Sequence, residues 1–204
     1  MKNIIPAVFL LSTILLIAGC NNAGNSAKVE NSSINNTDNG KDSIALTKLI
    51  RQMYKWHEEI GNPFDFEVEK NKPADTLYTG INWDAYNILL PIIVKSNYFD
   101  RQFIDNYTAI ATHIDSELKT GKTTWLVGDI SPFADDSNPW CSCQDTPHDN
   151  YWDILKVTDL KIVNDKATFS WTWGDGFKYK VKASRNNGVW KISYLEGFDP
   201  KNYK

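Results

Sequence analysis

The sequence predicts an α+β domain in which N-terminal helices pack on a curved, four-stranded antiparallel sheet that forms a meander. Two observations support this prediction. Apolar residues recur at helical spacing in the first part of residues 42–204, and apolar residues alternate with polar ones in the C-terminal third. A sheet with one aromatic face must bury that face, and amphipathic helices are its expected cover. We therefore expect residues 42–204 to form a single domain.

The first expected helix lies in DSIALTKLIRQMYKWHEEIG. Asp42 or Ser43 can cap its start, and Gly61 stands where a left-handed residue ends a helix. Tyr54 and Trp56 fall at the margins of its apolar stripe. The stripe itself consists of Leu46, Leu49, Ile50, Met53, His57 and Ile60. A histidine on such a stripe is more often a satisfied core residue than a catalyst, so we interpret His57 as part of the core.

Two further helices are indicated before the strands begin. The apolar run in INWDAYNILLPIIVKS is ambiguous, and one interpretation is a short buried helix that Pro91 ends or kinks. SNYFDRQFIDNYTAIATHIDSELKTG predicts a second long helix that starts at Ser96 or Asn97 and stops at Gly121. Its apolar stripe consists of Phe99, Phe103, Tyr107, Ile110, Ile114 and Leu118.

The last third of the chain changes from a period of 3.6 residues to a period of two. Four strands are expected in ILKVTDLKIV, KATFSWTW, FKYKVKAS and VWKISYL, joined by short turns that contain Asn, Asp and Gly. The inward face would carry Ala167, Phe169, Trp171, Trp173, Phe177, Tyr179, Val181, Ala183, Trp190, Ile192 and Tyr194. The outer face carries lysines, which discourage edge pairing. This outer sheet face is also a candidate homodimer surface.

The N-terminus resembles a bacterial lipoprotein signal. Lys2 precedes an apolar run over residues 4–17, and the run ends in LIAGC, which is similar to a lipobox. The resemblance implies a lipoprotein signal peptide at residues 1–19, cleavage before Cys20, and lipidation of Cys20 with a diacylglyceryl group. Two or three acyl chains give stable membrane attachment. The alternative is an ordinary signal peptide in which the cysteine occurs by chance.

Residues 20–41 are expected to form the lipidated cysteine and a flexible tether. NNAGNSAKVENSSINNTDNGK contains few apolar residues and many Asn, Ser and Gly, so it cannot offset the entropy cost of ordering. Asn21 after the lipidated cysteine resembles the sorting pattern of outer-membrane lipoproteins, which implies an anchor that faces the periplasm. The formal charge of −3 comes without a basic block, so nucleic acid is not an expected partner.

The order of elements also resembles a known superfamily. A helix, a loop, a helix and a meander ending in NNGVWKISYLEGF are similar to the cystatin-like, nuclear-transport-factor-2-like superfamily, in which a bent sheet wraps the helices into a cone. MYKWHEE, SNYFDRQFIDNY and PFADD…CQDTPHD…W further resemble a family of uncharacterised bacterial envelope lipoproteins with this roll. The resemblance covers residues 45–198. It implies a lipid-anchored domain with a pocket at the mouth of the cone.

The loop PWCSCQDTPHD raises a question about cysteine chemistry. In an oxidising compartment Cys141 and Cys143 can form a strained disulfide or remain free thiols. A zinc site with His148 and an aspartate is a third alternative, but C-x-C-x4-H is not a familiar structural-zinc spacing, so we expect no metal. We expect this rim loop to supply the contacts to a ligand or partner through Trp140, Gln144, Asp145, His148 and Trp152.

These features favour a non-enzymatic, lipid-anchored periplasmic binding or adaptor domain without a cofactor, for an envelope protein or a small apolar ligand. No hydrolase, protease or phosphate-loop motif is present. The first alternative is a small hydrolase or isomerase with an Asp/His pair in the cone, which Asp129, Asp136 or Asp145 could form with His113 or His148.

A second alternative is an immunity or inhibitor lipoprotein against an envelope-acting toxin. It would present a protein interface on the loop around Trp140, because exposed tryptophans supply large contact area at low entropy cost.

Overall fold

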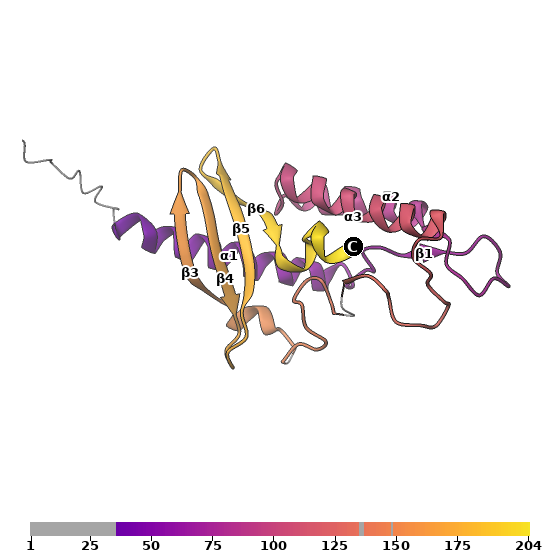
Figure 1. Ribbon diagram of the computed structural model, residues 1–204. Helices are drawn as coiled ribbons and strands as arrows, with labels where there is room; N and C mark the ends of the chain where they lie inside the picture. The colour runs from indigo at the N-terminus through magenta and orange to yellow at the C-terminus, as the bar shows by residue number, and fades with distance from the viewer. Residues whose placement is uncertain (1–35, 135–136, 148) are drawn as a thin grey trace, which may run out of the picture. The chain divides into compact units, whose positions relative to one another are not determined.

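The computed structural model describes residues 36–134, 137–147 and 149–204, which belong to one compact unit (Figure 1). The elements, in chain order, are α1 (Asn36–Glu59), β1 (Val68–Glu69), β2 (Gly80–Ile81), α2 (Trp83–Ser96), α3 (Arg101–Thr120), η2 (Tyr151–Ile154), β3 (Lys156–Val163), β4 (Lys166–Thr172), β5 (Tyr179–Asn186), β6 (Val189–Leu195), η3 (Glu196–Phe198) and η4 (Pro200–Tyr203). The predicted signal peptide (1–19), Cys20 and the tether up to residue 35 lie outside the described residues.

The α+β class and the four-stranded sheet are confirmed. Strands β3, β4, β5 and β6 pair antiparallel in sequence order, which is the predicted meander (Figure 1). Positive φ angles at Asn164 and Asp165, and again at Asn187 and Gly188, form the two-residue turns that join β3 to β4 and β5 to β6. The sheet is not strongly curled, so the coarse architecture is confirmed and the conical roll stays a prediction.

One residue of the predicted aromatic face lies on the opposite side of the sheet. The pairing of β5 with β6 shifts register after Lys182, which pairs with Tyr194, whereas the next residue, Ala183, pairs with Ile192. This bulge turns Leu195 into the core in place of Tyr194. The ammonium of Lys182 lies 4.8 Å from the centre of the Tyr194 ring. A single extra residue therefore reverses the alternation that the sequence predicts.

Helix α1 begins at Asn36, upstream of the predicted caps at Asp42 and Ser43, so the last residues assigned to the tether are helical. Asp42 is buried inside the helix instead of capping it. Its Oδ1 accepts hydrogen bonds from Arg185 Nη1 and Trp190 Nε1, both at 2.9 Å. The carboxylate therefore ties α1 to β5 and β6.

Helix α2 forms in the ambiguous apolar segment and continues through Pro91 to Ser96, so the proline does not end it. The helix is also not buried on all sides. Tyr86, Leu89 and Ile93 face the core, whereas Ile88 leaves 70% of its surface exposed. An apolar run without polar periodicity had predicted a buried helix, but only one face of α2 packs against the domain.

Helix α3 starts later than predicted, because Ser96 and Asn97 complete the end of α2. Asp100 is its N-cap and accepts a hydrogen bond from Phe103 N at 3.1 Å. Phe99 therefore precedes the helix and forms an isolated bridge with Ile192 of β6. The predicted stop at Gly121 is confirmed, with a left-handed φ of 68°.

Helices α1 and α3 both pack on the sheet, as the amphipathic stripes predict. Trp171 Nε1 of β4 donates to Tyr54 Oη of α1 at 3.1 Å, which joins the sheet to the first helix. The inward aromatic side chains Phe169, Trp171 and Tyr179 are buried, so they fill the space over the sheet. Within the described residues, no helix has the length and apolar content needed to cross a bilayer.

Candidate functional site

The rim-loop residues separate into two groups in the structure. Trp140 is 3% exposed and belongs to the core, so its ring does not offer the loop interface that a partner or toxin would contact. Gln144 and Asp145 are exposed, and Trp152 is half-buried with its ring 5.6 Å from that of Tyr151. His148 lies outside the described residues. The loop tryptophan thus holds the loop on the core.

Cys141 and Cys143 are joined by a disulfide bond, with only Ser142 between them in the sequence. Their sulfurs are consequently not available as the thiolates that zinc requires. Across the ranges that the structure describes, no group of three or more His, Cys, Asp and Glu side chains is placed to hold a metal ion. The disulfide lies directly beside Trp140, where the loop enters the core.

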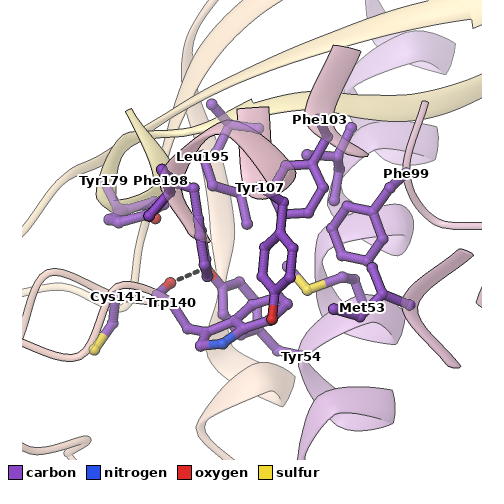
Figure 2. Packing of buried hydrophobic residues seen from close by; sticks show 14 of the residues in the cluster. Met53, Tyr54, Phe99, Phe103, Tyr107, Trp140, Cys141, Tyr179, Leu195 and Phe198 are labelled. Atoms are coloured by element: carbon purple, nitrogen blue, oxygen red, sulfur yellow. Dashed lines mark hydrogen bonds between the residues drawn. The ribbon is translucent and has the colours of Figure 1, made fainter. Parts of the chain in front are cut away.

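Two core tyrosines hold the backbone of this loop. Tyr54 Oη donates a hydrogen bond to the carbonyl of Trp140 (Figure 2). Tyr179 Oη donates to the carbonyl of Pro139 at 2.6 Å and accepts from Gly197 N at 2.8 Å. The Trp140 ring itself packs edge-on against Phe198, with centroids 5.0 Å apart. The loop segment is therefore anchored from three sides by α1, β5 and η3.

A cavity of about 420 Å³ lies next to this anchor. It is lined by the end of α1 and the segment after it, by α3, by the loop and by the C-terminal turn. The lining residues are His57, Asn62, Pro63, Phe64, Asp65, Phe66, Ile114, Trp125, Ser131, Phe133, Ala134, Ser137, Asn138, Pro139 and Tyr203. Phe64 leaves 87% of its surface exposed, so the cavity opens to solvent beside that residue.

His57 is buried at the wall of this cavity, with 4% of its surface exposed. Its ring stacks on Trp140 at a centroid distance of 3.9 Å. Among the residues that the structure describes, the Nε2 atom has no hydrogen-bond partner, so the side-chain hydrogen bond with Asn62 involves the other ring nitrogen. Burial lowers the pKa of His57 to about 4, and the imidazole is neutral at pH 7. The prediction of a core histidine is confirmed for its burial and wrong for its hydrogen bonding.

Asp65 is the second ionisable group of the cavity and is 9% exposed. Its Oδ1 accepts a hydrogen bond from Tyr107 Oη at 3.0 Å, and its Oδ2 accepts one from Trp140 Nε1 at 2.9 Å. Burial raises the pKa of Asp65 to about 7, although both hydrogen bonds act in the opposite direction. Sequence reasoning missed this residue, and its only signal was a carboxylate placed between Phe64 and Phe66 directly after a helix.

Among the Asp/His pairs predicted for catalysis, those of Asp129 and Asp145 with His113 lie within the described residues, and neither aspartate lines the groove that His113 lines. Asp129 and Asp145 are exposed in the loop, and Asp136 and His148 lie outside the described residues. His113 lines a different, open groove along α3 of about 1130 Å³. That groove is larger and more open, its His113 Nε2 likewise lacks a partner among the described residues, and its Arg101 contacts Asp105 at 2.8 Å. The less open cavity, with His57 and the buried carboxyl group of Asp65, is the better candidate site.

No protein-family model matches this chain, and neither a curated protein nor a solved structure is detectably similar to it. The fold and the site therefore define the class of protein by themselves. It is an α+β domain with an aromatic-lined, partly open cavity, whose wall holds a neutral histidine and a buried carboxyl group.

The raised pKa of Asp65 predicts a specific pH dependence of stability. Because the folded pKa is about 7 and the ordinary value is 3.8, the unfolded chain ionises first as the pH rises. Stability then falls by about 1.4 kcal/mol per pH unit between these values, up to about 4 kcal/mol in total. Asp65→Asn removes this titration, so its stability relative to wild type should improve from pH 4 to pH 8. Denaturant unfolding at a series of pH values measures this difference.

The variant Asp65→Leu provides the control, since it also removes the titration but makes different contacts. Both variants should show the same pH slope relative to wild type, whatever their constant offset. The opposing titration of His57 is present in all three proteins and cancels. A difference that stays flat from pH 4 to pH 8 would show that the carboxyl group titrates normally.

Proposed function

We propose that this chain is a lipid-anchored binding domain of the bacterial envelope, whose cavity takes a small ligand with an apolar body and a hydrogen-bond donor. The observation that carries the proposal is the unpartnered Nε2 atom of His57 beside a cavity of about 420 Å³. A buried acceptor without a partner costs about 1–3 kcal/mol. A ligand that donates a hydrogen bond to Nε2 would recover this cost.

The location follows from the N-terminal sequence. We propose lipidation of Cys20 after LIAGC and sorting to the outer membrane, facing the periplasm, with Asn21 as the sorting residue. We also propose that the domain is a member of the nuclear-transport-factor-2-like roll and of the envelope lipoprotein family that its motifs resemble. The order of helices followed by a meander supports this assignment. An envelope protein as partner, or a homodimer through the lysine-bearing sheet face, is compatible with the same anchor.

The binding proposal is tested with the full chain, purified from envelopes in mild detergent. Small molecules released on denaturation are identified by mass spectrometry and titrated back onto ligand-free protein. His57→Phe retains the stack on Trp140 and removes the unpartnered nitrogen. We expect its melting temperature to be unchanged or raised, because the orphan acceptor is gone, whereas its ligand affinity falls by about tenfold, the equivalent of one lost hydrogen bond.

The matched control is Cys20→Ala, which should leave the membrane fraction and still carry the same ligand, since the cavity belongs to the folded domain. If His57→Phe lowers the melting temperature and leaves affinity unchanged, His57 is a structural residue only. If the purified chain carries no small molecule and takes none up, the binding proposal is wrong.

A hydrolase or isomerase is the second candidate, because one aspartate and one histidine do line a single cavity. Asp65 is oriented by Tyr107 and Trp140, and its described hydrogen bonds do not include His57. The arrangement therefore lacks the contact by which a carboxylate orients a histidine base. The test is to incubate the ligand with the protein and then recover it. The enzyme would be favoured if the ligand is chemically altered by the wild-type protein and remains unaltered with Asp65→Asn.

A further inference from the structure

We infer that the cavity selects a protonated primary or secondary amine, held by Asp65, His57 and the surrounding aromatic rings. This inference names the ligand class of the proposed binding site and so rests on the proposed function. It follows from three independent properties of the lining: the sign of its charge, the kind of hydrogen-bonding atom that it offers, and the attraction of aromatic ring faces for cations.

Any charge on the described lining is negative. Among the described lining residues, Asp65 is the one that can carry a formal charge near neutral pH, since His57 is neutral and no described lysine or arginine lines the wall. A carboxylate offers about four acceptor positions, and the bonds from Tyr107 and Trp140 occupy two of them. An anionic ligand would be repelled in this low-dielectric site, whereas a cation would restore the charge balance that burial disturbs.

The aromatic rings of the wall favour the same charge. Trp125 and Phe133 pack edge-on with centroids 6.2 Å apart, and Phe66 and Tyr203 pack edge-on at 5.6 Å. All four residues line the cavity. A cation placed over such faces is attracted by the ring quadrupole, most strongly where water is excluded.

His57 narrows the class of cation. Its Nε2 has no partner among the described residues, and it is an acceptor when the neutral ring carries its proton on the nitrogen that faces Asn62. An N–H or O–H donor from the ligand would then satisfy it. A primary or secondary ammonium group supplies such a donor together with its positive charge. A quaternary ammonium group supplies the charge alone. The apolar side chains of Phe64 and Ile114 at the same wall fit the hydrocarbon body of an alkylamine.

Amine binding should be coupled to the ionisation of Asp65. Because burial raises the pKa of this carboxyl to about 7, a cationic ligand must shift the equilibrium toward the carboxylate. The titratable groups that interact with Asp65 are Tyr107 from α3 and Tyr203 from η4, and burial raises the pKa of both tyrosines. His57 from α1 lines the same cavity and is neutral. Affinity for an amine should therefore rise from pH 5 to pH 8.

The test is calorimetric titration of the purified full chain with four probes of equal chain length: hexylamine, hexyltrimethylammonium, 1-hexanol and hexanoate. We expect hexylamine to bind at least about tenfold more tightly than the alcohol and the carboxylate, and more tightly than the quaternary probe. In Asp65→Asn, the affinity for hexylamine should fall to that for hexanol. The thermal unfolding of this variant should stay cooperative. Asp175→Asn, a charge change at an exposed position between β4 and β5, should leave all four affinities unaltered.

Equal affinity for hexylamine and hexanol, or a preference for hexanoate, would overturn the amine assignment. So would an affinity for hexylamine that does not change in Asp65→Asn. These outcomes are distinct from a failure of the binding proposal. If His57→Phe still weakens the binding of 1-hexanol, the cavity binds ligands and only the assignment of its charge selectivity is wrong. If none of the probes binds but a neutral ligand is recovered from the purified protein, the amine assignment is again overturned.

Discussion

Trp140→Ala is expected to lower the free energy of unfolding by about 3–5 kcal/mol. The ring is buried and packs on His57 and Phe198. Its Nε1 donates one of the two side-chain hydrogen bonds that Asp65 receives, so truncation also leaves a buried carboxyl with one partner fewer. Equilibrium unfolding in denaturant measures the loss.

Trp152→Ala is the matched control, because Trp152 follows the same loop but is only half-buried. Its cost should be clearly smaller. Trp140→Phe separates the two contributions, since it keeps most of the ring contacts and removes the indole donor to Asp65. If Trp140→Ala costs no more than Trp152→Ala, the loop is not anchored through this ring.

Gly197→Ala is the second large effect, with an expected loss of about 3 kcal/mol or more. A Cβ atom at this position would lie 1.9 Å from the carbonyl oxygen of Pro139, which is backbone and cannot move aside as a flexible side chain would. Relief of the clash requires η3 to separate from the loop. This movement would break the bridge in which Tyr179 Oη bonds both Pro139 O and Gly197 N. Thermal and denaturant unfolding report the loss.

Gly40→Ala provides the control for the same chemical change. Gly40 lies in α1 with open space around its Cβ position, so alanine there should be neutral or stabilising by up to about 1 kcal/mol. A Gly197→Ala protein as stable as wild type would mean that η3 and the loop do not pack as closely as the structure places them. The contrast between the two glycines isolates packing from backbone entropy.

The strands were predictable because alternation is a local property. KATFSWTW predicts β4 and its buried face from nearest neighbours alone, and the short turns follow from residues that tolerate positive φ. The helix limits were less predictable, since Asp42 and Ser96 each suit a cap. Asp42 instead meets Arg185 and Trp190, which are distant in sequence. Competition from tertiary partners decided these boundaries.

The candidate site was not predictable from the loop that first suggested chemistry. Trp140 and Asp65 are 75 residues apart, and they meet only because α1, α3 and the loop converge. A tryptophan in an irregular segment reads equally well as an exposed contact or as an anchor, because local sequence does not report burial. The same limit applies to His57, whose stripe position predicted its burial but not its unpartnered nitrogen.

By itself, the sequence determined the elements that depend on local periodicity: two amphipathic helices, four strands in order, and their turns. It also located a pair of cysteines close enough to bond. The tertiary structure alone decided that Asp65 shares a cavity with His57. It also decided that burial lowers the pKa of His57 to about 4 and raises that of Asp65 to about 7. The physical reason is that desolvation and hydrogen bonding act through space, and the residues that cause them are remote along the chain.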